Sequence, residues 1–540
     1  MPVYESKLNT GSAGFKQNTA DQTAQLDMLR ILEARAVAAS EKRRPRFEER
    51  NQQTPHDRLT LLLDPGMPFL PLYNMAGYCV DDPDPETSIP GGSVITGIGF
   101  VNGVRVMVAV DDSGINAGAV TEMGFRKLLR AIEIAYDNKL PFIHLVESAG
   151  ANLMTYKVEL WANAGSVFYM LAKMSAAGIP TMTVLHGPST AGGAYMPGMS
   201  DYNVGVKHNG MAALGGAALV QAATGEVADE RALGGSEMHA SVSGLMEYLA
   251  EDDVDGLRQI RDVVEMIGWN EHCPPAPVRD FSEPVYDVDD ILGLVPVDYK
   301  VPYESRELIA RLVDHSDFTD FKPRYGTNLV CVQARIFGHP VAIVANNGPM
   351  GPDEAAKGAH FYQIVDQSNH PLIFLHNITG YMVGTEYEQA GMIKHGAKMI
   401  QAASNIRVPK ISFHVGASFG AGNYGMAGFG YKPDFLFAWP AARTGVMSGE
   451  SAAGTMETVA QNIAKRKGQE PDRAKLNKQR EAIMGVFTAQ EDAFYTSGLM
   501  LDHGVIDPRD TRKITGFILQ TLWERKHRIL QPNAFGVGRM

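Results

Sequence analysis

The sequence lacks the features that mark several common classes of protein. Its three cysteines, Cys79, Cys273 and Cys331, form no CxxC pair, which excludes a disulfide framework or a zinc ribbon and indicates a reducing, cytoplasm-like compartment. No run approaches the roughly 18 apolar residues of a membrane span, and the first residues do not have the basic-then-apolar order of a secretory signal. Because 49 Lys and Arg stand against 61 Asp and Glu, the net charge of −12 does not favour a nucleic-acid partner.

The residues that are present have a globular composition with one excess. Apolar residues make up 45% and charged residues 20%, which excludes a disordered or fibrous chain. The length of 540 residues predicts two or more domains. Glycine is over-represented, with 55 residues, or about 10% against an average near 7%. This excess makes the positions of the glycines informative about the structure.

The chain contains an internal duplication. Each half begins with a predicted hairpin and continues through a helix, a buried strand that ends in small residues, and a second helix. The hairpins lie at 97–112 and 335–347, the first helices at 123–138 and 353–368, the strands at 141–150 and 371–380, and the second helices at 160–176 and 388–403. Two unrelated segments with the same strand–glycine–helix order are the alternative interpretation.

The closest correspondence argues against chance. Residues 180–195 match residues 409–424 without a gap, 229 positions apart, with proline, glycine, serine and tyrosine in register. We therefore predict an α/β protein with two domains of one repeating design. The expected boundaries are an N-terminal tail at 1–19, a first domain at 20–272, a linker and the start of the second domain at 273–328, and the second domain at 329–540. An amphipathic helix is expected near 20–41 and a helix-rich segment at 455–530.

Each repeat ends a buried strand in a turn of small residues, Ser189–Ala194 and Ser418–Asn423. A turn from strand to helix leaves backbone N–H groups unpaired, and these can hold a negative oxygen. Glycine allows the ligand to approach the main chain closely. A neighbouring small turn, Ser148–Gly150 in one half and Thr379–Gly380 in the other, is expected nearby. The pattern predicts two oxyanion holes, suited to chemistry in which two carbonyl groups become anionic.

Three other interpretations of the same glycines remain open. Gly416–Gly420 fits the G-x-S-x-G nucleophile elbow, so a serine hydrolase would use Ser418 with His503 and either Asp434 or Asp492. Gly420–Gly425 fits G-x-G-x-x-G, which alone is a weak dinucleotide signal. In the third interpretation, the protein is a non-catalytic binding module and the glycines serve only for tight packing. The histidines of the predicted strands, His186, His376 and His414, are interpreted as core residues.

Seven short motifs are spread over both halves of the chain: Leu62–Gly66, Ser148–Leu153, Thr190–Tyr195, Ala222–Glu226, Asn377–Gly384, Lys394–Lys398 and Phe419–Met426. On these motifs the chain, from about residue 20 to the end, resembles the non-biotinylated carboxyltransferase (β) subunit of biotin-dependent acyl-CoA carboxylases. It is most similar to the 3-methylcrotonyl-CoA and geranyl-CoA carboxylase branch. The resemblance implies two tandem crotonase-like domains, a ligase component, and a homo-oligomer that is a hexamer, a trimer of dimers. It also implies the cytoplasm, or the mitochondrial matrix if the source is eukaryotic.

The resemblance further implies where the chemistry takes place. Biotin is carried by a partner, the biotin carboxylase/biotin carboxyl carrier subunit, and coenzyme A belongs to the substrate; no metal is implied. The backbone of Gly192 and Gly193, with Gly150, would hold the thioester oxygen. The backbone of Ala421 and Gly422, with Gly380, would hold the biotin carbonyl, and the two assignments can be exchanged. The chain has neither a Met-Lys-Met biotinylation site nor a GxxxxGK[ST] loop, so biotin and ATP chemistry are expected on the partner.

The same resemblance implies a set of substrate-binding residues: Ala149, Ala194, Tyr195, Gly198, Ala213, Gly215, Gly216, Ala217, Gln221 and Tyr424. Some of them depart from the family pattern, because Ala213 replaces a phenylalanine, Ala217 a proline and Gln221 a lysine. Lost side-chain volume makes room for an acyl group larger than methylcrotonyl, a branched α,β-unsaturated one. The alternatives are a propionyl-like saturated acyl-CoA carboxylase, a biotin-dependent decarboxylase, and a non-catalytic acyl-CoA-binding scaffold.

Overall fold

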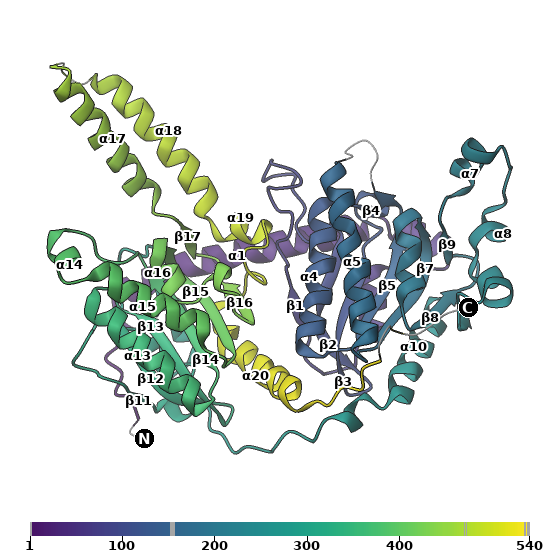
Figure 1. Ribbon diagram of the computed structural model, residues 1–540, viewed down its shortest axis with the longest axis horizontal. Helices are drawn as coiled ribbons and strands as arrows, with labels where there is room; N and C mark the ends of the chain where they lie inside the picture. Colours follow the sequence, from purple (N-terminus) through teal and green to yellow (C-terminus); the bar gives the residue numbers. More distant parts are fainter. Residues whose placement is uncertain (1–2, 152–156, 469, 471, 534–535, 537–540) are drawn as a thin grey trace. The chain divides into compact units, whose positions relative to one another are not determined.

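The computed structural model describes residues 3–151, 157–468, 470, 472–533 and 536. The chain divides into two compact units (Figure 1). The N-unit comprises Ile31–Ala276 and Gln520–Met540, and the C-unit comprises Met1–Arg30 and Pro277–Leu519. Each unit is therefore completed by a segment from the opposite end of the chain.

Polar contacts attach each terminal segment to its unit. In the C-unit, Asn18 Nδ2 donates to the Gly293 carbonyl at 3.0 Å. In the N-unit, Arg105 Nε pairs with Glu524 Oε1 at 3.1 Å. The sequence-based boundaries divide the chain into consecutive segments, and the compact units differ from them at these two ends. Contacts between residues hundreds of positions apart leave no local pattern in the sequence.

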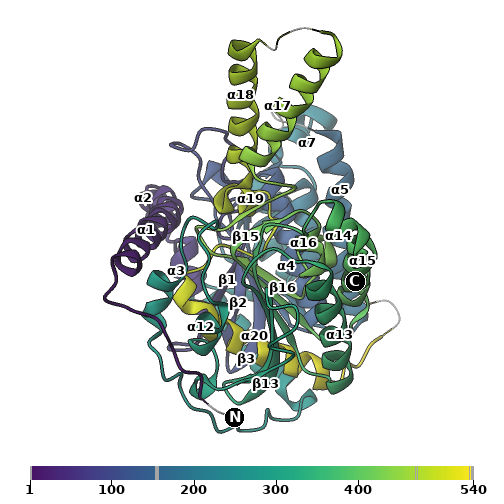
Figure 2. The same ribbon diagram turned by 90° about the vertical axis from the view of Figure 1, so that its left-hand side faces the viewer.

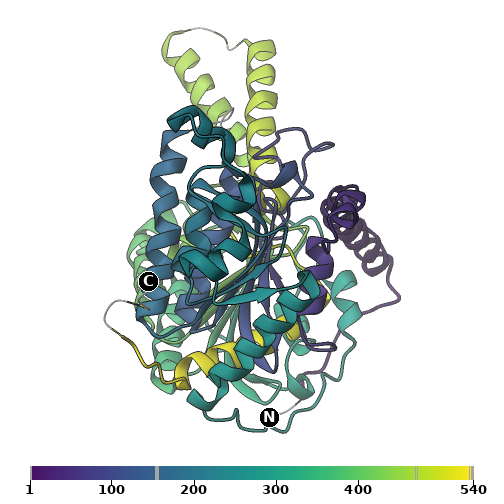
Figure 3. The same cartoon turned by 90° about the vertical axis from the view of Figure 1, so that its right-hand side faces the viewer.

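The N-unit is built on an eight-stranded mixed sheet in the order β1-β2-β3-β5-β7-β8-β10, with β9 paired to β7. Its strands are β1 (Leu70–Leu72), β2 (Val94–Val101), β3 (Val104–Asp111), β5 (Phe142–Ser148), β7 (Thr181–Thr190), β8 (Tyr202–Val206), β9 (Met211–Ala213) and β10 (Tyr248–Ala250), beside a small sheet of β4 (Ala119–Val120) and β6 (Gly150–Ala151). Its helices are α2 (Arg44–Glu49), α3 (Pro55–Leu62), α4 (Glu122–Asn138), α5 (Val158–Ala176), α6 (Tyr195–Met199), α7 (Ala217–Thr224), α8 (Glu230–Gly234), α9 (Ser236–Met238) and α10 (Asp253–Ile267). Figure 3 shows the blue and teal helices of this unit lying against its strands.

The C-unit repeats the design in a seven-stranded sheet, β11-β12-β13-β14-β15-β16, with β17 paired to β15. Its strands are β11 (Thr319–Asp320), β12 (Leu329–Ile336), β13 (His339–Asn346), β14 (Leu372–Ile378), β15 (Lys410–Phe419), β16 (Phe435–Ala438) and β17 (Arg443–Gly445). Its helices are α11 (Ile291–Leu294), α12 (Ser305–Ala310), α13 (Pro352–Ser368), α14 (Thr385–Gln389), α15 (Met392–Asn405), α16 (Gly420–Gly425), α17 (Gly449–Arg466), α18 (Arg473–Glu491) and α19 (Ala493–Gly498). The long helices α1 (Ala13–Glu41) and α20 (Thr511–His527) contain residues of both units.

The predicted hairpins, helices and strands of both halves are confirmed. Each hairpin closes on a two-residue turn with left-handed backbone, Asn102-Gly103 and Phe337-Gly338, which matches the twist of antiparallel strands. The central parallel strands carry apolar runs because both faces are covered, and every residue of β5 is buried. Leu26, Leu29 and Leu32 of the predicted amphipathic helix are buried on α1.

A β-bulge at the same place in both sheets is further evidence for the duplication. In the N-unit the pairing Val146↔Leu185 is followed by Ser148↔Ser189, so the second strand gains two residues. In the C-unit His376↔His414 is followed by Ile378↔Ser418, again with two extra residues on the second strand. β7 then pairs with β9, and β15 with β17. The bulge therefore redirects each strand toward its glycine turn.

A glycine makes room for a polar side chain at each bulge. A Cβ at Gly187 would lie 2.5 Å from Glu147 Cγ, and a Cβ at Gly416 would lie 2.4 Å from Asn377 Oδ1. Glu147 and Asn377 occupy equivalent positions at the ends of β5 and β14. The two glycines are thus required by close packing, not by backbone conformation.

The C-unit carries a projecting helical hairpin. Figure 2 shows α17 and α18 side by side, standing clear of the C-unit sheet, and no described residue of α18 is buried. This segment belongs to the helix-rich region expected at 455–530. Among the described residues, no helix combines the length and apolar composition that crossing a bilayer requires.

Substituting Gly187→Ala is expected to lower the free energy of unfolding by about 1–3 kcal/mol, because the new Cβ overpacks against Glu147. Gly165→Ala in α5 is the matched control, since nothing lies within 4 Å of its Cβ position, and it should stabilise by up to about 1 kcal/mol. Chemical denaturation of both variants measures the difference. Equal effects of the two substitutions would contradict the packing argument.

Candidate functional site

The first glycine turn follows strand β7 in the N-unit. β7 ends at Thr190, Ala191 adopts a left-handed φ of 54°, and a short 3-10 helix, η3 (Ala191–Ala194), begins. Main-chain N–H groups at the start of a helix have no acceptor within it, and no side chain caps the start of η3. Gly192 is exposed and Gly193 half-buried. The start of η3 is therefore not capped by a side chain.

The turn that follows β5 in the N-unit lies next to the end of β7. Gly150 has φ 78°, and a Cβ on it would lie 3.8 Å from the Thr190 carbonyl oxygen. Its N–H donates to Ser148 Oγ at 3.1 Å, and the N–H of Ala149 donates to the Gly118 carbonyl at 2.9 Å. The N–H groups of Gly150 and Ala149 are therefore already engaged within the N-unit. Residues 152–153 of the Ser148–Leu153 motif lie outside the described residues.

The C-unit repeats this arrangement with a glycine at the left-handed position. β15 ends at Phe419, Gly420 has φ 56°, and α16 begins without a side-chain cap. Gly380 has φ 132°, and a Cβ placed on Gly422 would lie 3.3 Å from Gly380 Cα and 2.6 Å from Ile378 Cγ1. The turn after β14 thus abuts the first turn of α16, as the sequence predicts for converging donors. Ala421 is exposed and Gly422 buried.

A tyrosine stands beside each turn. Tyr195 and Tyr424 are both 48% exposed. Tyr195 packs edge-to-face on Phe168 of α5, with ring centroids 5.7 Å apart, and a Cβ on Gly192 would lie 3.8 Å from Phe168 Cζ. Tyr424 packs on Tyr431 at 5.5 Å. Sequence reasoning missed Phe168, because an aromatic residue within a helix gives no signal that it faces a turn.

The predicted acyl-binding segment starts next to the first turn. Ala213 pairs with Thr190 in the β9–β7 ladder. Ala213, Gly215, Gly216 and Ala217 are half-buried, and Gln221 of α7 is exposed, as are the neighbouring Leu214 and Leu219. On the other side of the turn, Ala194 is buried and Gly198 half-buried. Of these small residues, Ala213 and Ala194 lie at the first turn, one paired with Thr190 and the other within η3.

A buried ionic network lies behind the first turn. Arg58 Nη1 pairs with Glu147 Oε2 at 2.7 Å and Arg58 Nε with Asp253 Oδ2 at 2.8 Å. Asp253 Oδ1 in turn contacts His186 Nδ1 at 2.8 Å. All four side chains are at most 2% exposed. Although burial opposes it, the neighbouring His186 and Arg58 hold the pKa of the Asp253 carboxyl well below its usual range. The network joins the ends of β5 and β7 at the bulge.

Sequence reasoning missed this network as well. The local signal is Glu147, a carboxylate inside a largely apolar strand, which requires a buried partner. Its partner Arg58 and the more distant Asp253 come from α3 and α10, and no spacing in the sequence links the three. The interpretation of His186, His376 and His414 as core residues is confirmed, since all three are buried.

The hydrolase triad expected as an alternative is not assembled. Ser418 is fully buried. His503 Nδ1 accepts from the Leu436 N–H at 2.9 Å, Asp434 accepts from the Lys410 N–H at 2.8 Å, and Asp492 pairs with Arg443 at 3.1 Å. None of these contacts leads to Ser418. That interpretation of the G-x-S-x-G pattern is therefore wrong.

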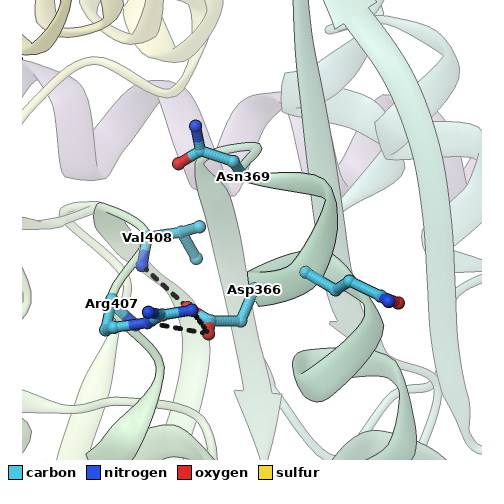
Figure 4. Close-up of a pocket in the computed structure, with 5 residues that line it drawn as sticks. Asp366, Asn369, Arg407 and Val408 are labelled. Carbon is cyan, nitrogen blue, oxygen red and sulfur yellow. Dashed lines mark hydrogen bonds and ion pairs between the residues drawn. The ribbon is translucent and has the colours of Figure 1, made fainter.

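The C-unit also has a polar hollow, at the amino-terminal ends of β14 and β15 (Figure 4). Arg407 pairs there with Asp366 at 3.1 Å, beside Gln367, Asn369 and Val408. These residues precede β14 and β15, whereas the glycine turns follow them. The hollow therefore takes no part in the site. The described part of the chain holds no group of three or more His, Cys, Asp or Glu residues that is arranged to bind a metal.

Residues 47–535 match the family model described as the carboxyl transferase domain. The chain belongs to this family. Over its full length it is 43% identical to a probable biotin-dependent acyl-coenzyme A carboxylase beta2 subunit of Mycobacterium tuberculosis, all of which is covered. With 99% of the chain and 100% of the relative covered, it is 40% identical to the biotin-dependent 3-methylcrotonyl-coenzyme A carboxylase beta1 subunit of the same organism.

A solved relative extends the match to three dimensions. The beta subunit of Pseudomonas aeruginosa geranyl-CoA carboxylase superposes with a TM-score of 0.93 and 43% identity, with both chains covered completely. The two tandem crotonase-like domains expected for the carboxyl transferase family are confirmed. The dinucleotide-binding interpretation of Gly420–Gly425 is wrong, because those residues form α16 of a carboxyl transferase domain.

Arg58→Met in this carboxyl transferase is expected to lower the free energy of unfolding by about 3–5 kcal/mol, because it leaves the buried carboxylate of Glu147 without its ion-pair partner and takes one of its partners from Asp253. Arg126→Met is the matched control: Arg126 is 55% exposed and pairs with Glu122 on the surface, so its loss should cost at most about 1 kcal/mol. Urea denaturation followed by circular dichroism measures both. Similar losses of unfolding free energy in the two variants would show that the buried network stabilises the fold no more than a surface ion pair does.

Proposed function

We propose that the chain is the carboxyltransferase (β) subunit of a biotin-dependent acyl-CoA carboxylase, which moves CO2 from carboxybiotin on a partner subunit to an acyl-CoA enolate. The observation that carries the proposal is the pair of equivalent turns, each with an uncapped helix start beside the end of a buried strand. The similarity to biotin-dependent acyl-coenzyme A carboxylase subunits supports it.

The proposed role of the chain is to hold two developing negative oxygens by main-chain N–H groups. Gly192 and Gly193 would bind one of them, and Ala421 and Gly422 the other, with Gly150 and Gly380 lining the two places. Carboxybiotin delivered by the partner would supply the CO2, and the ring nitrogen of the biotin left behind would take the acidic proton of the acyl-CoA. Donors fixed before the reaction stabilise an enolate without reorganising. Either turn can serve either oxygen, and the equivalence of the two turns agrees with this.

We further propose an acyl group larger than methylcrotonyl, branched and α,β-unsaturated. Ala213, which pairs with Thr190 next to η3, leaves space where the branch usually has phenylalanine. Phe168 and Tyr195 offer apolar surface next to Gly192. Gln221 is exposed and neutral, so we expect the phosphates of coenzyme A to be bound by other residues than this one. Ala149, Ala194, Gly198, Gly215, Gly216, Ala217 and Tyr424 complete the proposed substrate surface.

The proposed assembly is a homo-hexamer, a trimer of dimers, that works with a biotin carboxylase/biotin carboxyl carrier subunit in the cytoplasm or the mitochondrial matrix. Its direct test is to purify the native complex and screen acyl-CoA thioesters of increasing bulk for ATP- and bicarbonate-dependent carboxylation. Carboxylation of propionyl-CoA alone would favour the saturated alternative, and activity only in the reverse direction would favour a decarboxylase. Absence of any carboxyl transfer by the assembled complex would favour the scaffold.

In the same screen, Ala213→Phe is expected to lower kcat/KM for geranyl-CoA relative to methylcrotonyl-CoA about 10-fold or more, because the new ring fills the proposed space. Ala34→Phe is the matched control, on an exposed position of α1, and should leave the ratio unchanged. An unchanged ratio in Ala213→Phe would contradict the assignment of this wall to the acyl group.

Gly193→Val is expected to lower kcat about 100-fold or more with the fold retained. Its Cβ would lie 2.7 Å from Ser189 Oγ, and the added methyl groups would keep a ligand away from the main chain. Gly485→Val in α18 is the control, since nothing lies within 4 Å of that position. Steady-state kinetics with circular dichroism on both variants makes the comparison. Undiminished turnover in Gly193→Val would overturn the main-chain mechanism.

A further inference from the structure

The G-x-S-x-G serine has a structural environment that the nucleophile interpretation does not explain. Ser418 is fully buried. Its Oγ accepts a hydrogen bond from Asn423 Nδ2 at 2.8 Å and lies 2.9 Å from His376 Nδ1. Thr444 Oγ1 donates to the Ser418 carbonyl at 2.8 Å. The side chain of Ser418 is therefore linked to β14 and to the first turn of α16, and its main-chain carbonyl is linked to β17.

The directions of these hydrogen bonds follow from the donor inventory. A hydroxyl has one proton, and the amide NH2 of Asn423 can only donate. Ser418 Oγ therefore accepts from Asn423. Burial lowers the pKa of His376 well below its usual range, so its ring is neutral, and the tautomer of that ring sets which atom donates in the Ser418–His376 contact. The hydroxyl is engaged on two sides and fully buried, so a substrate cannot reach it as a nucleophile.

The link from Ser418 to Asn423 spans the second glycine turn. Residues 419–422 lie between the two bonded side chains, and they include Ala421 and Gly422, whose N–H groups we assign to one oxyanion. Gly420 within this span has the left-handed φ of 56°. A hydrogen bond across the span fixes the first turn of α16 relative to the end of β15. Preorganised donors lose their effect when they are displaced by fractions of an ångström.

The first turn lacks this link. Ser189 stands at the place equivalent to Ser418, but the residues equivalent to His376 and Asn423 are Val146 and Ala194. These pack in an apolar cluster with Leu185, Ala212 and Met246. Within the described residues, Ser189 Oγ is buried without a hydrogen-bond partner. The turn it precedes is also a 3-10 turn, not an α-helical one. Two equivalent serines thus have different surroundings.

We propose that Ser418 is a positioning residue for the second oxyanion hole, acting through Asn423 and His376, and that Ser189 has no such role. The inference rests on the proposed function, since it assigns the link to the donors Ala421 and Gly422. Its consequence is that the hydroxyl of Ser418 affects turnover more than substrate binding. The motif then marks a structural serine in a carboxyl transferase, not a hydrolase.

The experiment compares Ser418→Ala with Ser189→Ala in the complete carboxylase. Ser418→Ala should lower kcat about 10-fold or more and leave KM for acyl-CoA within about twofold, whereas Ser189→Ala should change kcat less than twofold. Asn423→Ala breaks the same bond from a half-buried position and should reproduce the loss. Because the two substitutions remove one interaction, the double variant Ser418→Ala/Asn423→Ala should be no slower than the slower single variant.

Amide hydrogen exchange tests the link independently of activity. Exchange at residues 420–424 should accelerate in Ser418→Ala, and exchange at residues 191–195 should stay unchanged in Ser189→Ala. Equal kinetics for the two serine variants, or unchanged exchange at 420–424, would overturn the proposal. An inactive wild-type complex would count against the proposed function alone, since the exchange measurement still decides the role of Ser418.

Discussion

Both halves depend on one constraint: a strand that turns into a helix leaves main-chain N–H groups without partners inside the helix. Both units bring a central parallel strand to this point, break its ladder with a two-residue bulge, and turn it at a left-handed residue, Ala191 or Gly420. In the proposed mechanism these N–H groups hold the two oxygens, and a larger side chain at either turn would occupy the space that the oxygen needs. The proposal thus accounts for the small residues at both turns, and it requires no side-chain acid or base.

The two halves hold the same geometry by different chemistry. In the N-unit the bulge is fixed by charge, with Arg58 between Glu147 and Asp253. In the C-unit the equivalent position is neutral: Asn377 Oδ1 accepts from the Ala417 N–H at 3.2 Å. An apolar cluster lies beneath the first turn, and hydrogen-bonded His376 and Ser418 lie beneath the second. Duplication has thus preserved the main chain, while the supporting side chains have diverged. Under the proposed function, in which the two turns bind different oxygens, each turn can be adjusted separately in this way.

Most of the fold and the position of the site could be predicted from the sequence, because they depend on local patterns. Paired strands around Asn102-Gly103, a proline before each buried strand, and a serine–glycine turn in register with its copy are all visible within a few residues. The rest depends on distant contacts. The attachment of residues 520–540 to the N-unit involves Arg105 and Glu524, and the network behind Glu147 needs Asp253. The difference between Ser189 and Ser418 lies in Val146 and His376, one strand away, where a local motif has no information.

The central claim is that main-chain amides hold both oxygens, and a structure of the complete carboxylase with acyl-CoA and biotin bound tests it most directly. The account predicts one carbonyl oxygen within about 2.7–3.1 Å of the Gly192 or Gly193 nitrogen, and the other at the same distance from Ala421 or Gly422. Carbonyl oxygens held by side-chain donors, with the amides of either turn directed away from the ligand, would contradict it.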